Sequence, residues 1–238
     1  RSVLYDKHRQ LIDSVQEEFT QYFPFEGCVE HNPEQIWDTV ISTLKSLVLR
    51  NDLNSGEIAS IGITNQRETT VIWNKKTGIP ISNAIVWQDR RTSKFCEELR
   101  SYEATIHKKT GLTIDPYFSA TKVNWLLNNI EGSKELAAAG ELLFGTIDTY
   151  LIWKLTEGKN HLTDVTNASR TMLFNIIDEK WDEDLLDIFN VPRSMLPEVC
   201  DNVSNYGVTN VIGGEVNIGG VAGDQQAATI GQCCFNPG

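Results

Sequence analysis

Apolar residues recur along the chain at two spacings, and the two patterns alternate from one end to the other. Short apolar runs bounded by polar residues predict strands, and apolar residues at steps of three and four predict amphipathic helices. The strands are expected at 2–6, 11–19, 58–64, 69–73, 84–87, 142–144 and 218–222. Strands and helices in alternation are typical of the α/β class.

Turn and capping residues refine this outline. Two hairpins are predicted, 2–6 with 11–19 and 58–64 with 69–73. The clearest helix begins at Asn32-Pro33, where a capping side chain precedes a proline at the first helical position. Further helices are expected around 95–99, over 123–130, over 147–155 with Gly158 as C-cap, from Trp181 to Asn190, and from Asp224 to Gln232.

The composition limits what the chain can bind. It has 238 residues, of which 40% are hydrophobic and 22% are charged, so it can bury a core. The net charge is −11 and the pI about 4.8, which argues against nucleic acid as a partner because nucleic-acid-binding proteins present a basic face. No stretch reaches the roughly 18 apolar residues of a membrane-spanning helix, so no membrane partner is expected.

Cysteines, histidines and glycines exclude several common sites. The five scattered cysteines are no disulfide framework and favour a reducing cytoplasm. The four histidines lack metal-ligand spacing, so no metal-binding residues are predicted. The sequence contains no G-x-x-x-x-G-K-[ST], G-x-G-x-x-G or G-x-S-x-G motif. The glycines between Gly213 and Gly223 favour a turn and a closely packed strand over a phosphate cradle.

Polar groups at strand ends are the first candidates for chemistry, because open α/β sheets bind ligands there. Arg67 and Glu68 lie between two predicted strands, where a plain hairpin would favour Asn-Gly or Asp-Gly. An exposed ion pair of little consequence is an equally good interpretation. In a functional interpretation, Arg67 donates and Glu68 accepts, which suits the neighbouring hydroxyls of a polyol.

Two aromatic residues and a second carboxylate extend this hypothesis. Trp87 and Tyr117, taken singly, are more typical of core packing, but an indole can cover a polyol's carbon skeleton while a phenol supplies one directed hydrogen bond. Asp224 follows Gly223 at a predicted helix start, where the helix dipole favours a carboxylate. The plainer interpretation is an N-cap. An amide, Gln225, follows it.

Read together, six segments resemble the amino-terminal domain of the FGGY carbohydrate kinases, and among these the members that phosphorylate glycerol. The segments cover nearly the whole chain in order, and Tyr117-Phe118-Ser119-x-x-Lys122-x-x-Trp125 fits the family's signature. Six matches in register are more specific than any one of them. They are TNQRETT (64–70), NAIVWQDRRT (83–92), TGLTIDPYFSATKVNWLL (110–127), LFGTIDTYLIW (143–153), TDVTNASRTMLFN (163–175) and GVAGDQQAA (220–228).

The resemblance implies an activity, a fold and a set of site residues. The activity is transfer of the γ-phosphoryl group of MgATP to a terminal hydroxyl of glycerol, giving sn-glycerol 3-phosphate. The fold is that of the actin-like ATPases, with ribonuclease-H-like α/β domains whose mixed sheets are flanked by helices. Homodimers or homotetramers are implied as well. With Asp224 as the general base, glycerol contacts are assigned to Arg67, Glu68, Trp87, Tyr117, Asp224 and Gln225.

The same resemblance predicts family parts outside this sequence. Residues 1–238 are expected to form the glycerol-binding amino-terminal domain without its first strand and phosphate-binding turn, which would precede Arg1. Arg1 itself is predicted to contact the nucleotide phosphates. The carboxy-terminal nucleotide-binding domain is expected after Gly238. We therefore expect this chain to be inactive alone, with ATP and Mg²⁺ bound mostly by other parts of the protein.

Two alternatives stay open. One is another FGGY kinase that acts on a pentulose or a different polyol, although Arg67-Glu68 and Trp87 favour glycerol. The other is a non-catalytic polyol-binding module. A substrate panel distinguishes the first alternative from a glycerol-specific kinase, and calorimetry with glycerol and ATP tests the second.

Overall fold

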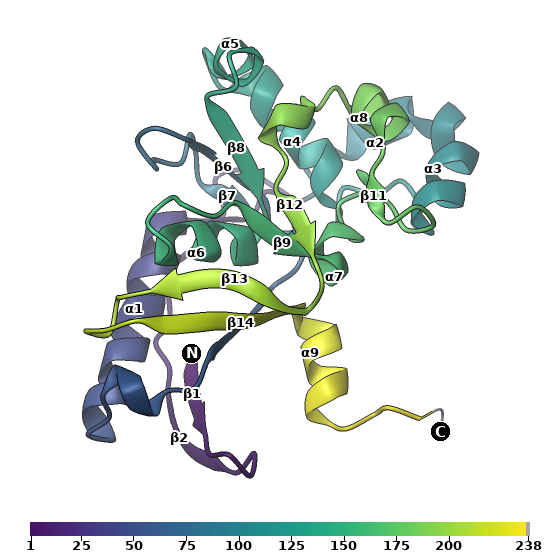
Figure 1. Ribbon diagram of the computed structural model, residues 1–238. Helices are drawn as coiled ribbons and strands as arrows, with labels where there is room; N and C mark the ends of the chain where they lie inside the picture. The colour runs from purple at the N-terminus through teal and green to yellow at the C-terminus, as the bar shows by residue number, and fades with distance from the viewer. Residues whose placement is uncertain (237–238) are drawn as a thin grey trace.

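The computed structural model describes residues 1–236, in which strands and helices alternate (Figure 1). The predicted mixed α/β class is confirmed. The α-helices are α1 (Pro33–Arg50), α2 (Ser93–Glu98), α3 (Glu103–Thr110), α4 (Ser119–Asn129), α5 (Ser133–Ala138), α6 (Ile147–Leu155), α7 (Val165–Ala168), α8 (Glu183–Phe189) and α9 (Asp224–Gly231). Single turns of 3₁₀ helix are η1 (Ser55–Glu57), η2 (Arg100–Tyr102) and η3 (Arg193–Met195).

The strands are short and belong to several small sheets. They are β1 (Ser2–Tyr5), β2 (Leu11–Val15), β3 (Gln21–Tyr22), β4 (Glu30–His31), β5 (Ile61–Asn65), β6 (Val71–Asn74), β7 (Ala84–Ile85), β8 (Leu142–Gly145), β9 (Leu162–Asp164), β10 (Phe174–Asn175), β11 (Lys180–Trp181), β12 (Glu198–Cys200), β13 (Val203–Thr209) and β14 (Val216–Gly223). The hydrogen-bonded orders are β13-β14-β5, β3-β4-β7, β6-β8, β12-β9, β10-β11 and β1-β2.

The sheet β13-β14-β5 positions the loops that matter most. β14 is antiparallel to β13 and parallel to β5, and the parallel pair ends with Asn65 opposite Gly223. Because two parallel strands leave a sheet at the same edge, the residues after Asn65 and after Gly223 emerge side by side. Open α/β sheets bind ligands at such an edge.

The predicted hairpin between 58–64 and 69–73 is wrong. β5 pairs with β14, and β6 pairs antiparallel with β8. The linker between them does not reverse over exposed turn residues, because the side chains of its charged pair are buried and Glu68 has a φ of 61°. Thr70 instead exchanges backbone hydrogen bonds with Ile85. The chain therefore crosses the end of the sheet and places β6 beside a different neighbour.

Local signals account for the elements that were predicted correctly. β1 and β2 form the first predicted hairpin, with Ser2 opposite Val15. α1 begins at Pro33, and Oδ1 of the preceding Asn32 accepts a hydrogen bond from the backbone N of Glu34 at 2.9 Å. Hairpin and capping chemistry fix both elements without help from distant residues.

One predicted helix end differs from the structure. α6 ends at Leu155 with Thr156 as its C-cap, rather than with Gly158. The chain already enters the left-handed region at Glu157, whose φ is 55°, and Gly158 follows with its backbone N donating to Trp153 O at 2.8 Å. Gly158 thus closes the turn two residues beyond the cap.

Two clusters of buried apolar side chains form the core. One lies among α2, α3, α4, α5 and α8, at the top of Figure 1, and includes Phe118. The other lies among α1, α6, β5, β6 and β14 and includes Val221 and the fully buried Trp73, whose ring centroid is 5.2 Å from that of Tyr150. Phe118 directly follows Tyr117, and Val221 comes three residues before Asp224. One cluster therefore supports Tyr117 and the other supports the strand that leads to Asp224.

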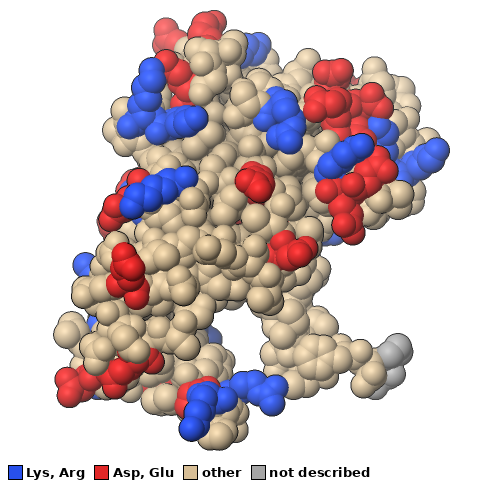
Figure 2. All heavy atoms as spheres, in the orientation of Figure 1, with Lys and Arg blue, Asp and Glu red and all other residues tan. Residues whose placement is uncertain are grey.

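Two predictions from the sequence concern the chain as a whole. The predicted domain 1–238 includes residues 237–238, which lie outside the described residues. Within residues 1–236, no helix is long and apolar enough to cross a membrane. On the face shown in Figure 2, Lys and Arg are scattered among Asp and Glu rather than gathered into one basic patch.

Candidate active site

The two adjacent strand ends bring Arg67 and Asp224 together. Arg67 comes two residues after β5, and Asp224 is the first residue after β14. Arg67 Nε lies 3.0 Å from Asp224 Oδ1, and Arg67 Nη1 donates to Gln226 Oε1 at 3.1 Å. The register of Asn65 opposite Gly223 therefore produces an ion pair between residues 157 positions apart in sequence (224 − 67).

Arg67 has a donor that the described chain leaves unused. Its side chain is only 4% exposed, whereas that of Asp224 is 55% exposed. The Nε–H group is not aligned on the carboxylate and has no hydrogen-bond partner among the described residues. A buried donor beside an exposed acceptor is complementary to a hydroxyl, which both accepts and donates a hydrogen bond.

Glu68 is fixed from several directions. It is 2% exposed, and Oε1 accepts a hydrogen bond from Arg170 Nε at 2.7 Å. Its backbone carbonyl accepts from Lys122 Nζ at 3.1 Å and from Ser119 Oγ at 3.3 Å. Burial raises the pKa of Glu68, while the hydrogen bond and charge of Arg170, followed by the charges of Arg67 and Lys122, oppose the rise. The result is an oriented acceptor held inside the protein.

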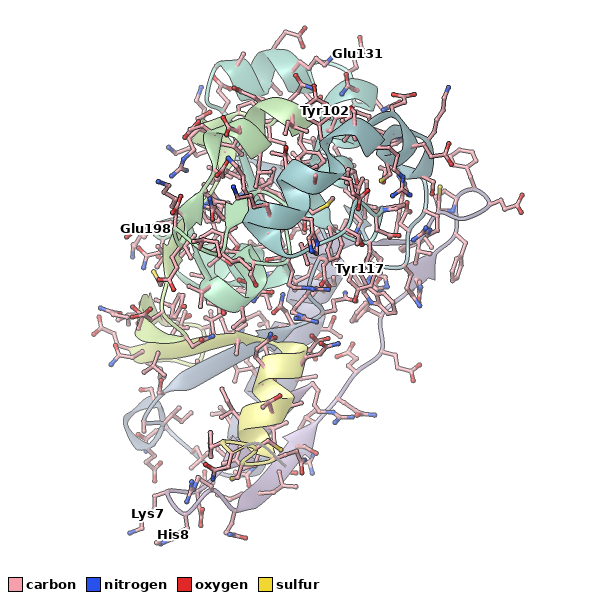
Figure 3. The ribbon with its side chains drawn as sticks, turned by 90° about the vertical axis from the view of Figure 1, so that its right-hand side faces the viewer. Lys7, His8, Tyr102, Tyr117, Glu131 and Glu198 are labelled. Atoms are coloured by element: carbon pink, nitrogen blue, oxygen red, sulfur yellow. The ribbon has the colours of Figure 1, made fainter. Side chains whose placement is uncertain are left out.

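Tyr117 and Trp87 supply the aromatic part of the site. Their ring centroids lie 5.6 Å apart with planes tilted by 58°, and Tyr117 is placed just before α4 by its backbone N donating to Asp115 Oδ1 at 2.8 Å. Trp87 is 37% exposed, so part of its ring is available. In Figure 3, Tyr117 is labelled in the upper lobe, above α9, which is drawn in yellow.

Electrostatic effects on Tyr117 place the charged residues around its phenol. Burial raises the pKa of Tyr117, and the negative charge of Glu68 adds to the rise. Arg170 and Arg67 oppose it, and Asp224 adds a smaller contribution in the same direction as Glu68. The pKa of this phenol is therefore affected by the carboxylates of Glu68 and Asp224 and by the guanidinium groups of Arg67 and Arg170. Direct contacts agree with this, because Lys122 Nζ donates to both Glu68 O and Tyr117 O and so joins the loop after β5 to the turn before α4. The ion pair between Arg67 and Asp224 joins the same loop to the start of α9.

Asp224 is not an N-cap, the plainer interpretation of its position. Gly223 is the N-cap of α9, no side chain caps this helix end, and Asp224 is the first helical residue. Its Oδ1 accepts a hydrogen bond from the backbone N of Gln225 at 2.9 Å as well as facing Arg67. The carboxylate is therefore oriented toward the strand-end loop and not committed to the helix backbone alone.

Two predicted site residues are not brought into this group. The side chain of Gln225 is exposed and makes no hydrogen bond within the part of the chain that the structure describes, whereas the next residue, Gln226, contacts Arg67. Successive residues on a helix point about 100° apart. The rotation of α9 about its axis therefore decides whether Gln225 or Gln226 faces Arg67. Arg1 lies at the start of the chain beside β1, where its guanidinium donates to Gln16 Oε1.

Sequence reasoning missed three residues of the site: Arg170, Lys122 and Gln226. Arg170 belongs to the segment 163–175 and Lys122 to the signature, but neither was given a role. Lys122 is fully buried, which lowers its pKa to about 7, and its Nζ donates to Tyr117 O at 2.7 Å as well as to Glu68 O. Sequence alone favours an exposed lysine, because buried lysines without a carboxylate partner are rare.

The arrangement can bind a small polyhydroxyl compound. Arg67 offers donors, Glu68 and Asp224 offer acceptors, Tyr117 offers a hydroxyl, and Trp87 offers an apolar face. Within residues 1–236, no group of three or more His, Cys, Asp or Glu side chains could hold a metal ion.

Comparisons with known proteins agree with this chemistry. Residues 1–231 match the FGGY family of carbohydrate kinases, N-terminal domain. The chain is 55% identical over 242 residues to a glycerol kinase of Sinorhizobium fredii, an alignment that covers 100% of this chain and 49% of that protein. The chain spans about half the length of the curated relatives it matches.

Solved structures give the same picture. The crystal structure of Plasmodium falciparum glycerol kinase with ADP is similar with a TM-score of 0.92 at 39% identity, covering 98% of this chain and 47% of that chain. Ligand-bound xylulose kinase from Lactobacillus acidophilus is similar with a TM-score of 0.82 at 24% identity, covering 96% of this chain and 46% of that chain. At 24% identity the second likeness concerns the fold alone.

Proposed function

Because this chain belongs to the FGGY family of carbohydrate kinases, as a match to the family's amino-terminal domain, we propose that the protein phosphorylates glycerol at a terminal hydroxyl. ATP is the proposed phosphoryl donor and sn-glycerol 3-phosphate the proposed product. FGGY kinases have the actin-like ATPase fold, so the predicted fold class is confirmed. Since the chain spans about half of its relatives, the activity is proposed for the full-length protein.

One observation carries the proposal. Arg67, Glu68, Trp87, Tyr117 and Asp224 come from four separate segments of the sequence and meet at one strand edge. A three-carbon triol has three hydroxyls, each able to donate and accept, and a short carbon chain that an indole can cover. The group offers a matching set of donors, acceptors and apolar surface.

The proposed mechanism gives each carboxylate a different task. Phosphoryl transfer depends mainly on positioning and charge stabilisation, because its transition state is loose. Asp224 accepts the proton of the attacking hydroxyl, and the adjacent Nε–H of Arg67 donates to the oxygen of that hydroxyl. Glu68 accepts hydrogen bonds from the hydroxyls that do not react. Trp87 covers the carbon chain, and the hydroxyl of Tyr117 supplies one further hydrogen bond.

The described residues fit the polyol better than the nucleotide. MgATP, when bound, would supply the γ-phosphoryl group. No metal-holding group of side chains occurs in residues 1–236, and Gly213 and Gly214 lie in the turn before β14, at the opposite end of that strand from Asp224. We therefore propose that ATP and Mg²⁺ are held mostly by residues outside the described range. Contact of Arg1 with the phosphates stays a prediction.

Further proposals follow from the sequence. The cysteines of the described residues are all free, which suits the reducing cytoplasm proposed as the location. Homodimers or homotetramers are proposed because the family resemblance implies them. Gln225 stays a proposed glycerol contact only if α9 presents it to the ligand, since Gln226 contacts Arg67 in this structure.

A substrate panel tests the proposed function. The full-length protein is given ATP with glycerol, xylulose, gluconate or erythritol, and ADP release is followed. We expect kcat/KM for glycerol to exceed that for each other compound by about 100-fold or more. A substrate of another shape leaves buried polar groups of the site without hydrogen-bond partners, which weakens binding of the transition state. A preference for xylulose or gluconate would assign the protein to another FGGY activity. Glycerol binding by calorimetry without any turnover would favour a polyol-binding module.

A further inference from the structure

One short segment contacts the Glu68 carboxylate at one end and the backbone of Gly223, the residue before Asp224, at the other. It consists of α7, the residue Asp164 that caps it, and Ser169-Arg170 that follow it; we call residues 164–170 the α7 segment. The segment lies between the strand end that carries Asp224 and the loop that carries Glu68. The proposed catalytic scheme assigns no role to any residue of the α7 segment.

The amino-terminal end of the α7 segment holds the end of β14. Thr166 Oγ1 accepts a hydrogen bond from the backbone N of Gly223 at 2.8 Å and donates to the carboxylate of Asp164. Asp164 is fully buried and, when ionised, only accepts hydrogen bonds. The hydroxyl proton of Thr166 is therefore directed at Asp164, which leaves a lone pair of Oγ1 for Gly223.

A second contact secures the same strand end. Asn202 Nδ2 donates both to Asp164 Oδ2 at 2.8 Å and to Val221 O at 2.9 Å. Asp164 thus holds β14 through Thr166 at Gly223 and through Asn202 at Val221. Such side-chain networks can contribute more than the sum of their individual bonds, because each member polarises the next.

These contacts matter because, within residues 1–236, α9 has little packing of its own. None of the residues of α9 is buried, and the helix stands out from the body of the molecule (Figures 1 and 2). Gly223, immediately before Asp224, is also crowded by Arg67, since a Cβ at this glycine would lie 2.3 Å from Arg67 Cδ. The position of Asp224 therefore depends on the last residues of β14.

The carboxyl-terminal end of the α7 segment holds the other carboxylate. Arg170 Nε donates to Glu68 Oε1 at 2.7 Å, and its guanidinium carbon lies 4.9 Å from the centroid of the Phe118 ring. The ring limits where the guanidinium can move. The middle of the segment is tied to the end of β5, because Asn167 Oδ1 accepts a hydrogen bond from Asn65 Nδ2 at 3.0 Å.

We infer that the α7 segment is a positioning element, in which Thr166 fixes the proposed base Asp224 and Arg170 fixes the substrate-binding carboxylate Glu68. One rigid turn of helix then sets the distance between the group that accepts the proton and the group that holds the substrate. This inference rests on the proposed function. It adds two residues that do not touch glycerol but act through residues that do.

The Thr166 end is tested with Thr166→Val in the full-length protein. The change removes the hydroxyl and keeps the shape, so the backbone N of Gly223 loses its partner. We expect kcat to fall about 10- to 100-fold, since small displacements of a reacting group cost this much, while KM for glycerol changes less than about threefold. Thr166→Ser keeps the hydroxyl and should restore most of kcat.

Thr110→Val is the matched control. Thr110 Oγ1 also donates to one backbone group, Ile106 O at 2.8 Å, and accepts from another, Leu112 N at 3.0 Å, at the end of α3. It should lower the thermal midpoint of unfolding about as much as Thr166→Val and leave kcat unchanged. Equal kinetics in the two valine variants would overturn the positioning role of Thr166.

The Arg170 end is tested with Arg170→Met. We expect KM for glycerol to rise about 10-fold or more with kcat within about threefold, because a charge-assisted hydrogen bond to Glu68 is lost. Without that guanidinium, KM should also begin to rise at a higher pH as the solution is acidified. Arg100→Met removes an exposed ion pair, with Glu103 at 2.9 Å, and should leave both constants unchanged.

The outcomes separate this inference from the proposed function. A folded wild-type protein that does not phosphorylate glycerol would refute the proposed function and the inference with it. A wild-type protein that does so, with Thr166→Val lowering kcat no more than Thr110→Val does and Arg170→Met leaving KM unchanged, would refute the inference alone. If Thr166→Val fails to fold, Thr166→Ala and Thr166→Ser are compared instead, and equal kcat values in these two would count against the role.

Discussion

The two carboxylates beside Arg67 have contrasting surroundings. Glu68 is 2% exposed and is held by Arg170 at its carboxylate and by Lys122 at its backbone carbonyl. Asp224 is 55% exposed, on a helix without a buried residue. Within residues 1–236, Glu68 lies in the interior, whereas Asp224 lies at an exposed edge.

This difference matches the two proposed tasks. A group that orients a substrate gains from rigidity, because a fixed acceptor loses no entropy when the ligand binds. A group that accepts a proton must pass it on, and an exposed carboxylate can exchange protons with water. The contrast therefore predicts that changes at Asp224 affect turnover with little cost in stability, while changes around Glu68 affect binding and stability together.

Asp224→Asn should have the largest effect on activity. We expect kcat to fall about 10²- to 10⁴-fold, the usual contribution of a positioned general base, with KM for glycerol largely kept. Because the side chain is exposed, the free energy of unfolding should change by less than about 0.5 kcal/mol. Steady-state kinetics and chemical denaturation measure both quantities. Normal turnover in this variant would show that Asp224 is not the base.

Arg67→Ala should have the largest effect on binding. Arg67 faces both the substrate position and Asp224, and hydrogen bonds to a charged group contribute about 1.5–3 kcal/mol, so KM for glycerol should rise about 10- to 100-fold. Arg67→Lys keeps the charge without the fork of donors and should recover only part of the affinity. A KM equal to that of wild type in Arg67→Ala would exclude a contact with glycerol.

Glu68→Gln sharpens the contrast between the two carboxylates. It keeps the shape but weakens the pair with Arg170, so we expect KM for glycerol to rise about tenfold and the free energy of unfolding to fall by about 1–3 kcal/mol. Glu97→Gln, at an exposed position of α2, is the control and should change neither quantity. If Glu68→Gln were as stable as Asp224→Asn, burial would not be what separates the two sites.

The smallest effect on activity is expected at Lys122, where the prediction concerns the pH dependence of stability. Burial lowers the pKa of this lysine to about 7 from an ordinary value of 10.5, so the unfolded chain binds more protons than the folded chain between these values. The free energy of unfolding should therefore rise with pH in this window, by up to about 1.4 kcal/mol per pH unit. Lys122→Met should remove this rise, which denaturation at pH 7, 8 and 9 would detect. The same slope in both proteins would contradict the assignment.

Elements set by neighbouring residues could be predicted from the sequence. The first hairpin and α1 depend on turn and capping residues within a few positions, and both were found. The pairing of β6 could not be found in this way, because its partner β8 begins at Leu142, far along the chain. A strand's pattern shows that it pairs but not with which strand.

Some residues of the candidate site could be predicted from the sequence, and others could not. Strand-end logic and the family resemblance pointed to Arg67, Glu68 and Asp224, and the parallel register of β5 with β14 explains why they lie together. Lys122 and Arg170 were missed because their value comes from burial against backbone carbonyls and a carboxylate, which only the packed chain creates. Those contacts join residues tens of positions apart, beyond the reach of local pattern.

The most direct test of the account is a crystal structure of the full-length protein with glycerol bound. The account predicts one glycerol with its carbons against Trp87 and its hydroxyls within about 2.6–3.2 Å of Arg67, Glu68 and Asp224. A glycerol bound at another place, or a carboxylate of Asp224 turned away from the other groups, would contradict it.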